Sequence, residues 1–254
     1  MLRYAHAIDC EGFSGLPQAL AGTRFMNSAP GYEFRHPDAD LRLLPEEALL
    51  TTGAVDHGNW NYRPCLGRIQ RLRFDLIRSM LQGSHAQRLL EIGYGSGIFL
   101  PELARHADQL YGIDPHPFTD NVAQVLEKHG VLASLVRGTA TQMPYENAFF
   151  QTVVAVSALE FIDDLPLACR EVKRVLTPGG IFVLVTPGHS SLLDLGLWLI
   201  TGASPRDDFG DRRIRILPCL FREFVVDRRA DYPPLLHRAF CLYTALRLSA
   251  PGNQ

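Results

Sequence analysis

Apolar residues first recur with a helical period between residues 66 and 81. Ile69, Leu72, Leu76 and Met80 lie three or four positions apart, and arginines occupy the other faces. This spacing predicts an amphipathic helix that buries one face. Similar patterns predict helices over residues 96–105, 119–129 and 165–176.

Short apolar runs rich in β-branched residues alternate with these helices. They predict strands over residues 88–92, 109–113, 131–136, 151–157 and 181–186. Strands that are apolar on both faces and alternate with helices are typical of a parallel sheet covered on both sides. We therefore expect an α/β fold with a Rossmann-like, doubly wound sheet, mostly parallel, closed by an antiparallel strand.

The pattern is less regular after Pro187. It predicts an apolar helix over residues 190–201, a loop rich in arginine and aspartate over residues 206–213, and closing strands over residues 224–228 and 241–248. We expect a core over residues 66–254 whose part from about residue 188 is variable.

Residues 1–65 show no sustained period. Prolines and glycines interrupt them, and only residues 16–21 and 45–50 indicate short helical pieces. Because they contain no compact apolar set, we expect an extension rather than a separate domain. Aromatic residues cluster just before the first core helix, so we interpret this extension as a lid over a site in the core.

The composition of the chain limits the kinds of molecule that it is expected to bind. The chain is 46% hydrophobic and 20% charged, which is typical of a globular protein, and its net charge of −2 gives no indication of nucleic-acid binding. The five cysteines form no Cys-x-x-Cys pair and predict neither a disulfide framework nor a metal site. Neither a spanning helix nor a secretory signal is visible, so we expect a cytoplasmic protein.

Two features leave weak contact with a membrane surface open. Residues 60–88 carry six arginines and one acidic residue, Asp75, although such a face is usually solvated. Residues 192–200 are apolar nearly all round, as in a lid, an interfacial anchor, a dimer face or a buried helix. The oligomeric state is not indicated.

The strongest local motif joins the first strand to its helix and reads Glu91-Ile92-Gly93-Tyr94-Gly95-Ser96-Gly97. Glycines let a ligand approach the backbone, and a helix start attracts an anionic group. A dinucleotide fingerprint requires glycine or alanine where this chain has Ile98. The motif therefore indicates a nucleotide-like site without specifying its ligand.

The second predicted strand ends at Asp114. An acidic residue at that strand tip can accept both hydroxyls of a ribose, or it can simply cap the following helix. Three further motifs follow in order along the chain: Val136-Arg137-Gly138-Thr139-Ala140, Ser157-Ala158-Leu159-Glu160-Phe161-Ile162-Asp163-Asp164 and Glu171-Val172-Lys173-Arg174-Val175-Leu176-Thr177-Pro178-Gly179-Gly180.

Together these five motifs resemble the class I S-adenosylmethionine-dependent methyltransferases, in their small-molecule branch, over roughly residues 66–190. The resemblance implies an enzyme that transfers a methyl group from S-adenosylmethionine to a small organic acceptor. It implies that Asp114 holds the ribose and that Pro115 packs on the adenine. The cofactor-binding residues that it implies are Glu91, Ile92, Gly93, Tyr94, Gly95, Gly97, Asp114, Pro115, Thr139, Ala140, Ser157 and Leu159.

This chain departs from the family at two positions. Thr139 stands where the family usually has an aspartate that binds the exocyclic amine of adenine. Phe161 stands where relatives often have histidine. The first departure predicts weaker cofactor binding, and the second removes one potential polar group.

A general base is needed only where the acceptor is a poorly acidic hydroxyl or carbon acid. The candidates are His57, which precedes the core, His189, which follows the fifth predicted strand, and Glu160. Each could instead be a surface residue. The aromatic side chains of Trp60 and Tyr62 are candidates for contact with an apolar or aromatic acceptor.

Two other functions compete with methyl transfer. A methyltransferase-like protein could have lost catalysis and serve as a binding or regulatory subunit, which Thr139 and Phe161 leave open. A nicotinamide-dependent oxidoreductase is less favoured, because neither lysine completes a Tyr-x-x-x-Lys pair. The residue four positions before Lys128 is Gln124, and the residue four positions before Lys173 is Cys169. The sequence indicates neither the acceptor nor whether oxygen, nitrogen or carbon is methylated.

Overall fold

The computed structural model describes residues 41–53, 56, 58–64, 66–188, 212–234 and 241–251. The chain divides into two units, Met1–Phe34 and Arg35–Gln254, and every described residue belongs to the second. The predicted helices at residues 16–21 and 190–201 lie outside the described residues, as do His57 and His189. The division into a lid over residues 1–65 and a core over residues 66–254 stays a prediction.

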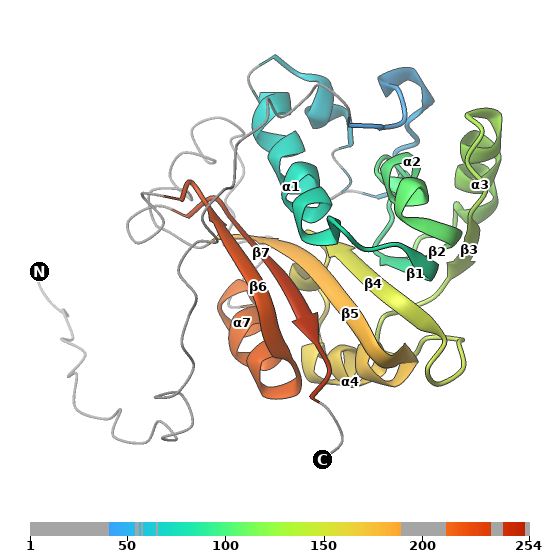
Figure 1. Ribbon diagram of the computed structural model, residues 1–254. Coiled ribbons are helices and arrows are strands. Elements are labelled where there is room, and N and C mark those ends of the chain that lie inside the picture. Colours follow the sequence, from blue (N-terminus) through green and yellow to red (C-terminus); the bar gives the residue numbers. More distant parts are fainter. Residues whose placement is uncertain are drawn as a thin grey trace, which may run out of the picture. The chain divides into compact units, whose positions relative to one another are not determined.

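The described residues form a seven-stranded sheet in the order β3-β2-β1-β4-β5-β7-β6 (Figure 1). Neighbouring strands from β3 to β5 are parallel, whereas β7 is antiparallel to both β5 and β6. The strands are β1 Ala86–Ile92, β2 Ala107–Asp114, β3 Ser134–Arg137, β4 Phe150–Val156, β5 Leu176–Pro187, β6 Val225–Tyr232 and β7 Tyr243–Ser249. The predicted fold class is confirmed. Because the parallel strands share one direction, their carboxyl ends meet at one edge of the sheet.

Helices cover both faces of this sheet (Figure 1). The α-helices are α1 Leu66–Leu81, α2 Leu100–Leu103, α3 Thr119–Lys128, α4 Leu165–Val175 and α7 Arg212–Glu223. Short 3₁₀ turns are η2 Glu46–Ala48, η3 Gly58–Tyr62, η4 Ala104–His106 and η5 Leu159–Phe161. None of the described helices is long and apolar enough to cross a membrane.

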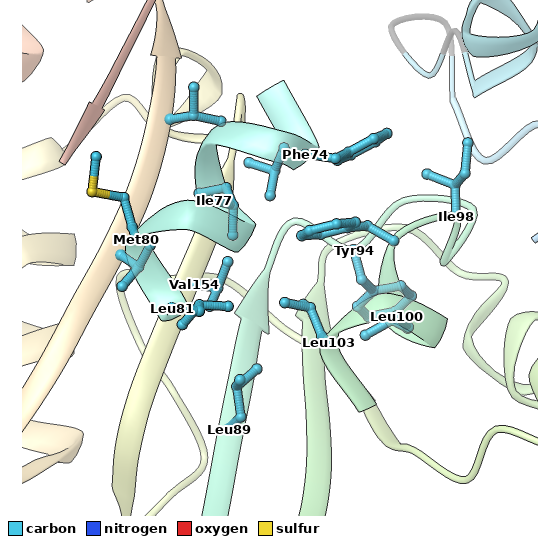
Figure 2. Packing of buried hydrophobic residues seen from close by; sticks show 14 of the residues in the cluster. Phe74, Ile77, Met80, Leu81, Leu89, Tyr94, Ile98, Leu100, Leu103 and Val154 are labelled. Carbon is cyan, nitrogen blue, oxygen red and sulfur yellow. The ribbon is translucent and has the colours of Figure 1, made fainter. Parts of the chain in front are cut away.

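Alternate strand residues face two separate apolar cores. Leu89 of β1 and Val154 of β4 pack with α1, α2 and α3, and Figure 2 shows this core, including Phe74 and Ile77 of α1. Leu90, the next residue of β1, packs on the other face with α4 and α7. Burial on both faces explains why the strands are apolar at consecutive positions instead of alternating.

The helix predicted over residues 96–105 is much shorter in the structure. Only α2 is α-helical, and η4 follows it directly. Gly95 and Gly97 have positive φ angles of 51° and 76°, which keep the preceding turn out of the helix. Pro101 lies in the first turn of α2, where its missing N–H is not needed.

The structure also corrects the C-terminal prediction. Arg212 and Arg213, expected in a loop, begin the twelve-residue helix α7. Ile216 and Leu220 are fully buried on its inner side, a spacing of four that indicates a helix. Pro218 obscured this signal, but it is exposed, and the burial of its apolar neighbours outweighs the backbone hydrogen bond that it cannot make.

The pairing of β5 also differs from the expectation. The Pro178-Gly179-Gly180 segment, expected only to end a helix, lies inside β5. There the register with β4 shifts between Phe150 and Thr152. Gly179 has a φ of 75°, which a bulge at this point requires.

We expect Phe182→Ala to lower the free energy of unfolding by roughly 3–5 kcal/mol. The Phe182 ring is fully buried in β5, and its centroid lies 5.6 Å from that of Phe224, which follows α7. Ile214→Ala, on the outer side of the same helix, is the control and should change stability by less than about 0.5 kcal/mol. Urea denaturation measures both, and equal losses would contradict this account of the core.

Candidate functional site

The glycine loop, residues 93–97, follows β1 at the carboxyl edge of the sheet. Gly93 and Gly97 leave no room for a side chain, since a Cβ would lie 2.6 Å from the Cβ of Ala158 and 2.9 Å from Cγ1 of Val122, respectively. A Cβ on Gly95 would meet nothing closer than the Asp56 carboxylate, at 3.8 Å. The loop is therefore packed tightly at its ends, whereas at its centre a small side chain would make only ordinary contact with the Asp56 carboxylate.

Asp114, at the tip of β2, is tied to the centre of this loop. Its Oδ2 accepts a hydrogen bond of 2.9 Å from the Gly95 N–H, and its Oδ1 accepts one of 3.2 Å from the N–H of His116. Each carboxylate oxygen has a further lone pair, so both can also accept a ligand hydroxyl. This geometry suits a residue that holds a diol beside the loop.

His116 links the residues after β2 back to the glycine loop. Its Nδ1 accepts a hydrogen bond from the Phe118 N–H at 3.1 Å, so Nε2 carries the proton and donates to the Gly95 carbonyl at 2.9 Å. His116 is not among the site residues predicted from the sequence. Its signal was only its place two residues after the acidic strand end, which many surface residues share.

Two residues of the glycine motif turn their side chains into the apolar cores. The Tyr94 ring is buried in the core below α1 and α2 (Figure 2), and its hydroxyl donates to Oγ1 of Thr119 at 3.2 Å. Burial raises the pKa of this hydroxyl. Ile92 is buried in the opposite core. Only the backbone of these two residues is available to line a ligand.

Several buried polar atoms near the strand ends have no hydrogen-bond partner among the described residues. They include Oε2 of Glu91, Oγ of Ser96, Oγ of Ser157, Oε2 of Glu160 and Oγ1 of Thr186. Glu91 and Glu160 expose only 2% and 1% of their surfaces. An unsatisfied buried polar group costs about 1–3 kcal/mol, so such atoms are usual where a ligand completes the site. The residues present thus fit a polar ligand at this edge.

The two buried glutamates have strongly raised pKa values. Burial raises the pKa of Glu91 to about 8, and the charge of Asp114 adds to this, while Arg73 opposes it. Burial raises the pKa of Glu160 to about 7, against its own backbone N–H and the guanidinium groups of Arg213 and Arg73. Both carboxyl groups are therefore able to exchange a proton near neutral pH.

The predicted adenine end lies next to Asp114 along the sheet edge. The Gly138 N–H donates to the Asp114 carbonyl at 3.0 Å. Thr139 is exposed, with its hydroxyl 3.0 Å from that of Thr141, and Ala140 is buried. Pro115 is exposed on the same side of the strand tips. Leu159 is buried in the core of the α4 side, next to Glu160.

The segment before α1, residues 41–64 and here called the strap, packs on the chain that follows the glycine loop. The Leu44 N–H donates to the Ile98 carbonyl at 3.1 Å. The Tyr62 hydroxyl donates to the Leu44 carbonyl, and burial raises its pKa to about 12. Trp60 is partly buried, with the Arg63 guanidinium 5.9 Å from its ring centroid. Tyr62 thus serves the internal packing of the strap.

Parts of this chain are similar in sequence to known proteins. Residues 90–184 match the methyltransferase domain family. The ubiquinone biosynthesis O-methyltransferase of Azorhizobium caulinodans is 32% identical over 100 residues, which cover 39% of this chain and 40% of the relative. The 2-methyl-6-phytyl-1,4-hydroquinone methyltransferase 1 of Oryza sativa subsp. japonica is 24% identical over 139 residues, covering 53% and 39%. The chain spans less than half the length of these two relatives.

Solved structures share the fold. The [4+2]-cyclase SpnF has a TM-score of 0.58 at 18% identity, covering 75% of this chain and 85% of that one. The N-methyltransferase NodS from Bradyrhizobium japonicum WM9, solved in complex with S-adenosyl-L-homocysteine, has a TM-score of 0.52 at 18% identity, covering 72% and 87%.

The strand order, the glycine loop after β1 and the carboxylate at the tip of β2 define a Rossmann-like fold. Residues 90–184 match the methyltransferase domain family, so this part of the chain is similar to domains that use S-adenosylmethionine.

We expect Gly95→Val to abolish measurable binding of S-adenosylmethionine in calorimetry. Gly95 has a φ of 51°, and a valine side chain would fill the centre of the loop. Gly130→Val is the matched control, because Gly130 has a φ of 74° and nothing within 4 Å of its Cβ position. It should share the loss of stability caused by a β-branched residue at positive φ and keep the affinity. Unchanged affinity of Gly95→Val for S-adenosylmethionine would show that the cofactor does not bind at this loop.

We expect the free energy of unfolding of the ligand-free protein to fall as pH rises from about 4.5 to about 8. In this window the native Glu91 keeps its proton and the unfolded chain does not, so the slope is at most roughly −1.4 kcal/mol per pH unit for this group. Glu91→Gln should flatten the slope, whereas Glu127→Gln, on the exposed side of α3, should not. Denaturation at several pH values measures this, and identical slopes in all three proteins would refute it.

Proposed function

We propose that this chain is an active methyltransferase that transfers a methyl group from S-adenosylmethionine to a small, apolar or aromatic organic acceptor. The observation that carries the proposal is the group of buried, unpartnered oxygens on Glu91, Ser157 and Glu160 at the sheet edge. A polar ligand bound there would satisfy them. The family match supports the identity of that ligand.

The proposed cofactor contacts follow the strand tips. Asp114 would accept the ribose hydroxyls, Pro115 would pack on the adenine, and residues 138–140 would border the adenine edge. Glu91 and the backbone of residues 92–97 would line the methionine part. Ser157 and Leu159, which follow β4 in the chain, would border the methionine part from that side. The bond from the Gly95 N–H to Asp114 supports this arrangement, because it holds the ribose and methionine sides together.

When bound, S-adenosylmethionine supplies a methyl group on a positively charged sulfur, which an acceptor atom displaces in line. The chain's task is to orient the acceptor and to exclude water. Glu160 is the base candidate that the described residues support best. With a pKa of about 7 it is partly ionised at neutral pH and could accept a proton from an acceptor hydroxyl. His57 and His189 remain candidates outside the described residues.

The proposed class of acceptor is inferred from the names of the relatives and from the aromatic residues of the strap. The relatives' names include ubiquinone biosynthesis, a phytyl hydroquinone and sterols, which contain large apolar parts. Transfer to both oxygen and carbon occurs among these names, so the atom methylated here stays open. We propose that residues 1–65 cover the acceptor and that Trp60 contributes an apolar contact. Tyr62 is the weaker candidate, since its hydroxyl is bonded to Leu44.

A second candidate function is binding without methyl transfer. Thr139 is exposed and uncharged where relatives usually carry an acid, and Phe161 replaces a frequent histidine. SpnF, which shares this fold, is moreover a [4+2]-cyclase. In this alternative the site would bind S-adenosylmethionine and a partner molecule without turnover.

Turnover of radiolabelled S-adenosylmethionine on a panel of phenols, hydroquinones, amines and carboxylic acids tests the proposal. Transfer to one acceptor class, lost on Glu160→Gln and retained in Glu146→Gln on an exposed turn, would support both the reaction and the base. Tight binding of S-adenosylmethionine without transfer to any acceptor would favour the second function. Binding of nicotinamide cofactors instead would refute both.

We expect Asp114→Ala to weaken S-adenosylmethionine binding by about 1.5–3 kcal/mol, the range of a charge-assisted hydrogen-bonding group. Asp114→Asn should lose less, because one acceptor oxygen remains. Asp108→Ala, at the exposed start of the same strand, is the control and should keep the parent affinity. Titration calorimetry measures all four proteins, and equal affinities would mean that Asp114 only organises the loop.

A further inference from the structure

Asp56 lies in the strap and is held in one orientation by three donors. Its Oδ2 accepts hydrogen bonds from the Thr52 hydroxyl at 2.7 Å and from the Thr52 N–H at 3.3 Å. Its Oδ1 accepts one from the Gly58 N–H at 3.2 Å. All three partners belong to the strap, so the carboxylate is fixed by its own segment.

This carboxylate faces the centre of the glycine loop. Its carboxyl carbon and both of its oxygens lie 3.8 Å from the position that a Cβ on Gly95 would have. The neighbouring Gly58 lies closer still, since a Cβ there would lie 3.1 Å from Oγ of Ser96. The strap therefore crosses the loop next to Gly95 and Ser96.

Two observations indicate that a ligand belongs between the strap and the loop. The Ser96 hydroxyl is buried, with 2% of the residue exposed, and has no partner among the described residues. Asp56 itself forms no ion pair with a described arginine, lysine or histidine. The Asp114 carboxylate, which accepts the Gly95 N–H, lies at the same loop, and two carboxylates there favour a cationic ligand.

We propose that Asp56 binds the ammonium group of the amino-acid part of S-adenosylmethionine. This rests on the proposed function, which puts the methionine part beside Gly95. An ammonium group donates three hydrogen bonds, and Oδ1 of Asp56, which accepts only the Gly58 N–H, retains a lone pair for one of them. The strap would thus recognise the amino-acid end, while the strand tips recognise the nucleoside.

Asp56 would then be a specificity residue. Ligands that contain the nucleoside and sulfur but lack the amino acid would bind without using it. S-Adenosylhomocysteine and 5′-methylthioadenosine form such a pair, because both have a neutral sulfur and only the first has the ammonium group. Comparing the two separates the charge of Asp56 from its part in holding the strap.

Isothermal titration of the full chain with both compounds tests the inference. We expect Asp56→Asn to raise the Kd for S-adenosylhomocysteine by about 10- to 100-fold, the range for a hydrogen bond to a charged group, and to leave that for 5′-methylthioadenosine unchanged. Glu46→Gln, an exposed acidic residue of the strap, is the matched control and should change neither. Thermal unfolding of each variant verifies that the fold is kept.

The outcomes are distinct. An equal loss for both compounds would make Asp56 a residue that only holds the strap, and no loss for either would remove it from the site. Both results overturn the inference while leaving the cofactor site intact. A parent protein that is folded but binds neither compound would overturn the proposed function, and this inference with it.

Discussion

The hydrogen bond from the Gly95 N–H to the Asp114 carboxylate joins the ends of β1 and β2, and the candidate site depends on it. Two parallel strands end side by side, but their following turns diverge to different helices. The bond, with the return contact from His116 to the Gly95 carbonyl, ties the two turns into one unit. The two strand ends are thereby held at a fixed separation.

The carboxyl edge of the sheet also contains groups whose burial or backbone conformation lowers stability. Glu91 and Glu160 are buried with raised pKa values, and Ser157 has a φ of 49°, which is unfavourable for a residue with a side chain. Strain and unpaired polar atoms of this kind persist where the surrounding structure enforces them, most often at functional sites. The two apolar cores provide that enforcement, because β1, β4 and β5 are buried on both faces where they reach this edge.

Much of the fold could be predicted from the sequence, because periodicity reports burial directly. The limits of α1 and α3, and the core of each parallel strand, follow from the spacing of their apolar residues. Predictions failed where local signals conflicted. Pro218 obscured the period of α7, and the glycines and Pro101 left only one turn of the helix predicted after the loop.

A residue's position in the candidate site was predictable where it depends on its own strand end, as for Asp114 at the end of β2. It was not predictable where the role depends on distant contacts. Asp56 reaches Gly95 only through the path of the strap, and the bond from His116 to Gly95 spans 21 positions of the chain. The inward direction of Tyr94 is likewise invisible in a motif defined by its glycines.

Tyr94 has a consequence for how this protein can vary. Its ring lies in the same apolar cluster as α1, so the middle of the cofactor loop is anchored in the core of that face. Because close-packed interiors transmit changes of volume, repacking around Phe74 or Leu103 would shift the loop, whereas repacking on the α4 side would reach it only through the sheet. A change of volume in the core of the α1 side would therefore reach the glycine loop directly, through the side chain of Tyr94.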